Sequence, residues 1–177
     1  MTMFEIATQH DRYTTYILSD QETNSILEIV PERGGIVTRW QVHGKDILYL
    51  DAERFADPAL SVRGGIPILF PICGNLPDNT YTYNGQTYTL KQHGFARDLA
   101  WEVTEQVTQD RVSLTLVLNS NGTNPGGLSL RFSAGFYLHA AQRHPGNPSA
   151  LHQSLRCAYA FLRGVSPLFS SDRQNPA

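Results

Sequence analysis

Two short segments contain the residues best suited to polar chemistry. Arg63 opens a Gly- and Pro-punctuated apolar run, RGGIPILFPICGN, and His93 and Arg97 lie in KQHGFARD. A histidine can exchange protons or donate hydrogen bonds near neutral pH, and an arginine can fork onto hydroxyl groups or a phosphate. The glycines beside Arg63 and His93 let the backbone come close to a ligand. These residue types predict a pocket for an anion or another polar ligand.

Each of these residues also has an ordinary structural explanation. Arg63 could pair with a carboxylate at a sheet edge, and His93 could be a core histidine satisfied by a backbone carbonyl. Arg97 and Asp98 could form an exposed charge pair. Neither Gly34-Gly35 nor Gly64-Gly65 belongs to a strand-to-helix phosphate loop. Spacing alone therefore leaves both explanations open.

The elements that must position these segments are β-strands. Short runs rich in Ile, Val, Thr and aromatic residues are separated by polar or Gly-containing breaks, as strands are; they cover residues 3–8, 13–19, 25–30, 35–42, 46–50, 101–107 and 111–119. The expected fold class is all-β, a large antiparallel β-sandwich.

Two of these strands should alternate between a buried and an exposed face. In residues 35–42 we expect one face to carry Ile36, Thr38, Trp40 and Val42, and the other to carry Val37, Arg39 and Gln41. In residues 111–119 one face should carry Val112, Leu114, Leu116 and Leu118.

Two turns are also predicted. His43-Gly44 should follow residues 35–42, and Asn84-Gly85 separates two Thr/Tyr-rich arms in TYTYNGQTYTL. Asn and Gly both accept the positive φ of a type I′ turn, so the second segment predicts a β-hairpin.

Composition excludes several classes of function. The 177 residues carry 14 Lys and Arg against 16 Asp and Glu, a formal net charge of -2 and a pI near 6.3, so nucleic acid is not an expected partner. No apolar stretch approaches the ~20 residues that cross a bilayer, and the start lacks a secretion signal. We expect a soluble cytoplasmic protein without a membrane partner. Cys73 and Cys157 predict neither a disulfide framework nor a zinc site.

The two segments, in this order and spacing, resemble the aldose 1-epimerase or galactose mutarotase-like family, especially the branch that includes hexose-6-phosphate mutarotases. The likeness covers roughly residues 20–119, including PERGGIVTRWQVHGKDILYL. It implies a large β-sandwich, the galactose mutarotase-like supersandwich, with a sugar pocket on its concave face. In that family the arginine of the RGGIP-type motif and the histidine and arginine of HGFAR line the pocket. The resemblance therefore assigns substrate binding to Arg63, His93 and Arg97.

The chemistry that the resemblance implies is interconversion of α and β anomers. A base takes the proton of the anomeric hydroxyl while an acid protonates the ring oxygen; the ring opens, the carbonyl end rotates, and closure reverses the transfers. This needs no cofactor and no metal, so the expected partner is a small-molecule sugar or sugar phosphate. His93 would have a supporting catalytic role. The sequence does not predict an oligomeric state.

The last third of the chain does not continue the likeness. Mutarotases of this kind carry their acid, a histidine in a motif like GFHPYF, and their base, a glutamate, beyond the matching part. After Arg111 the chain has no glutamate, and no role is assigned to His139, His144 and His152, which lie in no matching motif. We therefore divide the chain into residues 1–127, the N-terminal part of a mutarotase-like sandwich that is C-terminally incomplete, and residues 128–177, a divergent tail.

Charge and the genetic code both separate this tail from the rest. Residues 1–110 hold 15 of the acidic and 8 of the basic residues, whereas residues 111–177 hold six arginines, one aspartate and no lysine. With permitted codons for residues 147–169, the same bases read one position later can spell IHQRYTNHSDAPMPFSAGFHPYF, which resembles the family's continuation. We therefore expect a change of reading frame between residues 119 and 130. The alternative is an unusual polar extension with two poor strands.

Three functions remain open at this point. The first is an isomerase that interconverts anomers of an aldose or hexose phosphate, impaired in this chain because its main acid and base are missing. The second is a noncatalytic carbohydrate-binding module that keeps this half of the pocket. The third is an inactive truncated product, which would expose unpaired strand edges and an apolar face.

Overall fold

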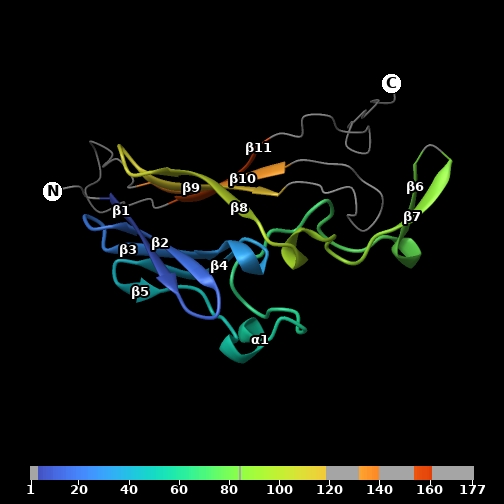
Figure 1. The fold of residues 1–177 in the computed structure, drawn as a ribbon, viewed down its shortest axis with the longest axis horizontal. Coiled ribbons are helices and arrows are strands. Elements are labelled where there is room, and N and C mark those ends of the chain that lie inside the picture. Colours follow the sequence, from blue (N-terminus) through green and yellow to red (C-terminus); the bar gives the residue numbers. More distant parts are fainter. Residues whose placement is uncertain (1–3, 84, 119–131, 140–153, 161–177) are drawn as a thin grey trace, which may run out of the picture.

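The computed structural model describes residues 4–83, 85–118, 132–139 and 154–160. The two larger of the sheets that these residues form are antiparallel and lie one above the other (Figure 1). The first sheet has the strand order β1-β2-β3-β4-β5. Its strands are β1 (Phe4–His10), β2 (Thr14–Asp20), β3 (Ser25–Val30), β4 (Ile36–Val42) and β5 (Lys45–Asp46). The second sheet has the order β11-β10-β9-β8. Its strands are β8 (Glu102–Val107), β9 (Val112–Leu118), β10 (Phe132–His139) and β11 (Ser154–Ala160).

The remaining elements are short. Strands β6 (Thr80–Tyr83) and β7 (Gln86–Thr89) form a separate hairpin that projects from one end of the molecule (Figure 1). The single α-helix of the described residues, α1 (Ala52–Ala56), begins at Asp51, whose carboxylate accepts a hydrogen bond from the Arg54 backbone N–H. Three 3₁₀ turns complete the set: η1 (Pro31–Arg33), η2 (Pro77–Asn79) and η3 (Ala96–Asp98). The predicted all-β antiparallel class is confirmed.

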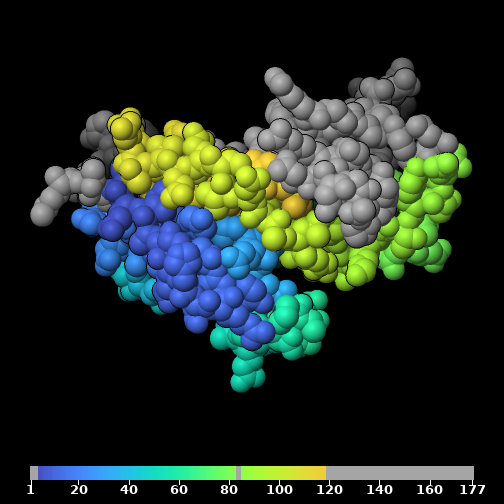
Figure 2. All heavy atoms as spheres, viewed as in Figure 1, coloured from blue at the N-terminus to red at the C-terminus, as the bar shows by residue number. Residues whose placement is uncertain are grey.

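The hydrophobic core lies between the two sheets. Strand β9 carries Val112, Leu114, Leu116 and Leu118 into one buried cluster, as its alternation predicts. The first sheet contributes Leu18, Leu27, Ile29 and Val37 to the same cluster. In Figure 2 the yellow segment that contains β8 and β9 covers the blue strands of the first sheet. Burial of these aliphatic side chains is the main free-energy gain that holds the layers together.

The predicted alternation of β4 is wrong at one point, where a β-bulge intervenes. Glu28 pairs with Arg39, but the next residue of β3, Ile29, pairs with Val37, so Thr38 is an extra residue. A bulge of one residue changes which side chains share a face. Val37 and Trp40, opposite the buried residues Ile29 and Leu27, therefore share the core face. Arg39 lies on the opposite face with Glu28 and makes ion pairs with Glu28 and Asp46.

Both predicted turns are present. Val42 pairs with Lys45 around His43-Gly44, and both turn residues have positive φ, 50° and 76°. Tyr83 pairs with Gln86, which confirms the hairpin around Asn84-Gly85; Gly85 has φ 76°, and Asn84 lies outside the described residues. The strand expected at residues 46–50 is reduced to β5, because the chain then leaves β4 and pairs with the segment that follows Arg63.

No helix within the described ranges is long and apolar enough to span a bilayer.

Candidate functional site

The two segments singled out by the sequence lie side by side. Phe70 and Gly94 form a parallel bridge, and the Phe70 carbonyl accepts hydrogen bonds from the N–H groups of Phe95 (2.9 Å) and Ala96 (3.2 Å). Gly94 has φ 70°, and a Cβ at this position would collide with the Phe70 carbonyl oxygen. Only glycine fits such a close approach in this conformation. The RGGIP-type run and the HGFAR turn are therefore one packed unit.

His93 is held by the loop that ends the apolar run. Its backbone N–H donates to the Gly74 carbonyl (2.8 Å), and its Nδ1 accepts a hydrogen bond from the Gly74 N–H (3.0 Å). An Nδ1 that accepts from a backbone N–H cannot carry the proton of the neutral ring, so the proton lies on Nε2. The hydrogen-bond partner of the His93 ring is thus the Gly74 N–H group, and not the backbone carbonyl expected for a core histidine. His93 is half-buried, and its Nε2–H is the available donor.

Arg97 lies in η3, and only some of the N–H donors of its guanidinium have hydrogen-bond partners among the described residues. One terminal nitrogen donates to the Gln92 carbonyl (3.3 Å), and Nε lies 3.9 Å from the nearer carboxylate oxygen of Asp98. Its Nε is buried and has no hydrogen-bond partner among the described residues. The side chains of Arg97 and Asp98 are 30% and 54% exposed, so their ion pair is a solvent-accessible one, as considered from the sequence. Such a pair contributes little stability.

Arg63 is exposed and lies on a short two-stranded ladder. Its carbonyl accepts from the Asp51 N–H (2.9 Å), the Tyr49 carbonyl accepts from the Gly65 N–H (2.7 Å), and Leu50 pairs with Gly64 between them. Within the described part of the chain the Arg63 guanidinium has no hydrogen-bond or ion-pair partner. The carboxylate partner that would have given it a purely structural role is therefore missing from those residues.

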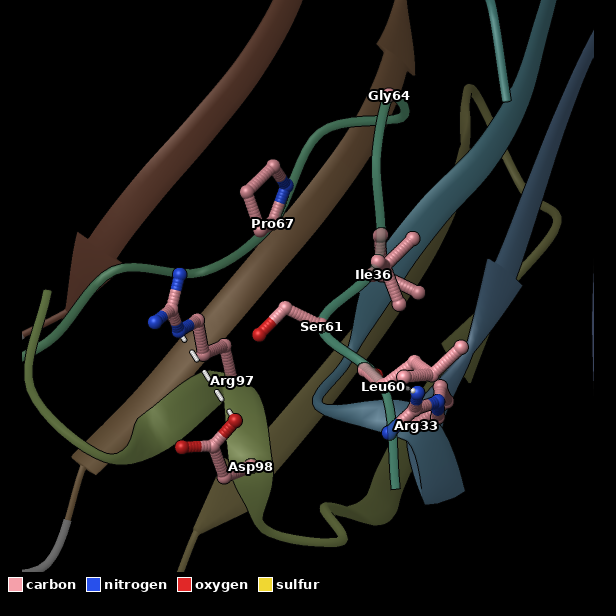
Figure 3. Close-up of a pocket in the computed structure, with 9 residues that line it drawn as sticks. Arg33, Ile36, Leu60, Ser61, Gly64, Pro67, Arg97 and Asp98 are labelled. Carbon is pink, nitrogen blue, oxygen red and sulfur yellow. Dashed lines mark hydrogen bonds and ion pairs between the residues drawn. The ribbon is translucent and has the colours of Figure 1, made fainter. Parts of the chain in front are cut away.

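A small pocket lies between the HGFAR turn and the loop before Arg63 (Figure 3). Its volume is about 50 Å³, and it is lined by Arg33, Ile36, Leu60, Ser61, Val62, Gly64, Pro67, Arg97 and Asp98. Pockets that bind small molecules usually measure about 300–1,000 Å³. This pocket is therefore too small to enclose a hexose. Of the three predicted site residues, Arg97 lines this pocket, whereas Arg63 and His93 lie outside it.

Sequence reasoning assigned no role to Arg33 and Ser61, which line the pocket, although Arg33 lies in PERGGI and Ser61 directly precedes the segment of Arg63. The sequence signal that could have pointed to Arg33 is its position directly before Gly34-Gly35 in PERGGI. The backbone conformation of a glycine turn, and not strand alternation, sets the direction of a side chain beside it. Among the described residues no cluster of His, Cys, Asp or Glu could hold a metal ion.

The chain is similar to known proteins in both sequence and structure. A sequence model described as aldose 1-epimerase matches residues 16–139. A protein of Cenchrus ciliaris named "Putative glucose-6-phosphate 1-epimerase" is 37% identical over 71 residues, which are 40% of this chain and 18% of that protein.

Two solved structures are similar in fold. The Slr1438 protein of Synechocystis sp. PCC 6803 is 50% identical, with a TM-score of 0.69 over 77% of this chain and 48% of that one. A galactose mutarotase-like protein from Clostridium acetobutylicum is 20% identical, with a TM-score of 0.62 over 81% of this chain and 47% of that one, and this match supports the fold alone. The chain spans about half the length of these two structures.

Proposed function

The chain belongs to the aldose 1-epimerase family, and we propose that it carries the sugar-binding half of a site that interconverts the anomers of a hexose or hexose 6-phosphate. The observation that carries the proposal is the fixed placement of His93 on the same turn as Arg97, with Nε2–H as its donor. A phosphorylated hexose is the favoured substrate, because two arginines are offered and the Cenchrus ciliaris relative is named for glucose 6-phosphate.

The proposed residues divide the work by their chemistry. His93 Nε2–H donates a hydrogen bond to a hydroxyl or ring oxygen of the sugar and so supports proton transfer there. Arg97, whose Nε has no hydrogen-bond partner among the described residues, and the exposed Arg63 bind hydroxyl groups or a phosphate. In the reaction, the anomeric hydroxyl loses its proton to a base while the ring oxygen gains one from an acid. The C1–O5 bond then breaks, C1 becomes a carbonyl that rotates, and ring closure returns both protons.

We further propose that activity is impaired in this chain. Residues 111–177 contain no glutamate to act as the base. Because the base is missing, the second candidate function is sugar binding without catalysis, as in a carbohydrate-binding module.

The test is the rate at which freshly dissolved α-glucose and α-galactose, with and without a 6-phosphate, reach their anomeric equilibrium, followed by polarimetry or NMR exchange. Rates well above the buffer rate, lost in Arg63→Ala and His93→Ala but kept in Arg39→Ala, would support catalysis by this chain. Saturable sugar binding at the buffer rate would support the binding module. Neither binding nor acceleration, with a broad unfolding transition, would identify an inactive product.

We also propose that the mutarotase-like part ends near residue 127 and that residues 128–177 are a divergent tail produced by a change of reading frame. The family match and strand β10 both extend past residue 127 to residue 139, which weighs against a boundary at residue 127. The gene sequence is the sharpest test. Resequencing codons 115–135 decides it. An uninterrupted frame whose codons cannot encode the family's continuation would rule the frame change out.

A further inference from the structure

We propose that Arg33 is a positioning residue that sets the spacing between the loop that carries Arg63 and the turn that carries Arg97. Its consequence for sugar binding rests on the proposed function, whereas its effect on the loop can be measured in the free protein.

The guanidinium of Arg33 binds one loop through backbone oxygens. Nε donates to the Phe55 carbonyl (3.3 Å), one terminal nitrogen donates to the carbonyls of Asp57 (2.7 Å) and Leu60 (2.6 Å), and the other donates to the Pro58 carbonyl (3.4 Å). Four of its five N–H groups are thus directed at the last turn of α1 and the loop that follows it. A planar guanidinium holds several acceptors at fixed angles, which a lysine ammonium cannot reproduce.

The clamped loop leads directly into the segment of Arg63. Leu60 is followed by Ser61, whose carbonyl accepts from Arg54 Nε (3.1 Å), and the Arg63 carbonyl is then fixed by the Asp51 N–H. Arg54 and Asp51 belong to α1 and its N-cap, at the other end of the same loop. Releasing the Arg33 contacts would therefore loosen the loop immediately before Arg63.

On its other side, the turn that contains Arg33 packs against the turn of Arg97. Gly34 has φ 79°, and a Cβ at this position would collide with the Arg97 carbonyl oxygen. The Pro31 carbonyl accepts from the Trp101 N–H (3.0 Å), and Trp101 Nε1 donates to the Ala96 carbonyl (3.0 Å). The η1 turn is therefore a common base for both site segments, and Figure 3 shows Arg33 and Arg97 as two lining residues of one pocket.

Charge alone does not explain the placement of Arg33. Within the described residues its guanidinium makes no ion pair, and most of its N–H groups are occupied by carbonyls rather than directed at a ligand. A role through its electric field would be kept by lysine, while a role through the fork of hydrogen bonds would be lost. The four hydrogen bonds to backbone carbonyls therefore favour a role through hydrogen bonding over a role through charge.

The experiment compares Arg33→Lys and Arg33→Met with Arg39→Lys and Arg39→Met. Arg39 is a matched control because its guanidinium is also partly exposed and hydrogen-bonded, but to Glu28 and Asp46 on the outer face of the first sheet. The first readout is amide hydrogen exchange at Asp51 and Gly65, whose N–H groups hold the ladder of Arg63. Core amides of β9 serve as the reference for global stability.

We expect both Arg33 variants to accelerate exchange at Asp51 and Gly65 at least tenfold while β9 is unchanged, and we expect the Arg39 variants to change neither. The second readout is affinity for glucose and for glucose 6-phosphate, by NMR titration. Both Arg33 variants should weaken the binding of glucose 6-phosphate about tenfold or more, and that of glucose by no more than this factor, because Arg63 and Arg97 are the proposed phosphate ligands and the strength of their contacts depends on their placement.

Two results would overturn the inference: unchanged exchange at Asp51 and Gly65, or an Arg33→Lys variant that behaves as the unmodified protein. If Arg33→Met does not fold, the comparison of Arg33→Lys with Arg39→Lys still decides the question. If the unmodified protein binds neither sugar, the proposed function fails, and the exchange data still test the positioning role.

Discussion

The Gly74 N–H donates a hydrogen bond to Nδ1 of His93 over 3.0 Å, while the Gly74 carbonyl accepts from the His93 N–H over 2.8 Å. This reciprocal pair joins the end of the apolar run to the HGFAR turn. It also orients the imidazole, since a ring held at Nδ1 by a fixed backbone donor presents Nε2–H in one direction. His93 itself has φ 66°, a left-handed conformation that is uncommon for a residue with a side chain.

The tautomer of His93 is therefore a direct prediction. In the neutral ring we expect the proton on Nε2, because Nδ1 accepts from Gly74. Long-range ¹H–¹⁵N correlation spectra distinguish the two tautomers. His43, which is exposed, is the internal reference and should show averaged nitrogen shifts. A protonated Nδ1 in neutral His93 would contradict the structure.

Gly94→Ala should destabilise the protein more than Gly85→Ala. Both glycines have similar positive φ, 70° and 76°, so both substitutions incur the left-handed cost of about 1–2 kcal/mol. Only Gly94 lies against a backbone carbonyl, that of Phe70, whereas nothing lies within 4 Å of a Cβ at Gly85. We expect the free energy of unfolding to fall by at least about 1 kcal/mol more for Gly94→Ala, measured by urea denaturation. Equal losses would show that the Phe70 contact can relax.

Tyr81 should ionise at a higher pH than a free tyrosine. Burial raises the pKa of its phenol, and the neighbouring Tyr88, stacked at 5.3 Å between ring centroids, raises that pKa further. Because the pKa of Tyr81 is higher in the folded than in the unfolded protein, its contribution to the free energy of unfolding is fully present below the unfolded-state pKa of about 10. This contribution is lost as the pH rises through the folded-state pKa. The difference in absorbance at 295 nm between the unmodified protein and Tyr81→Phe should show a phenol that titrates above the ordinary pKa of about 10. Unchanged titration in that variant would refute the assignment.

Leu116→Ala should lower the free energy of unfolding by about 3 kcal/mol, because Leu116 is fully buried and its removal leaves a cavity between the sheets. Ile47→Ala is the control, since Ile47 is 50% exposed, and its effect should stay within about 0.5 kcal/mol. Chemical denaturation of both variants measures the difference. A small loss for Leu116→Ala would mean that the layers do not pack as described.

Local patterns in the sequence were sufficient for most strands. The observed ends of β1 to β4, β8 and β9 differ from the predicted ones by at most two residues. The Asn84-Gly85 and His43-Gly44 turns were also readable, because φ preferences and alternation act between neighbouring residues. The fold class followed from these elements, and the segments of Arg63, His93 and Arg97 could be recognised by their motifs.

Tertiary packing decided what strand alternation could not. The bulge at Thr38 moved Val37 to the core face, and residues 49–51 paired with residues 63–65 instead of extending β5. Both outcomes depend on which backbone groups meet across the fold, and a period of two carries no information about an extra residue.

The sequence by itself therefore determined the strands, the two hairpin turns and the family motifs, because each depends on residues close together in the chain. The tertiary structure alone decided that Gly94 lies on Phe70, that Gly74 fixes the ring of His93, and that Arg33 clamps residues 55–60. These contacts join segments about 20 or more residues apart, and a hydrogen bond forms only when donor and acceptor come within about 3.5 Å. That condition is set by the packing of the whole domain.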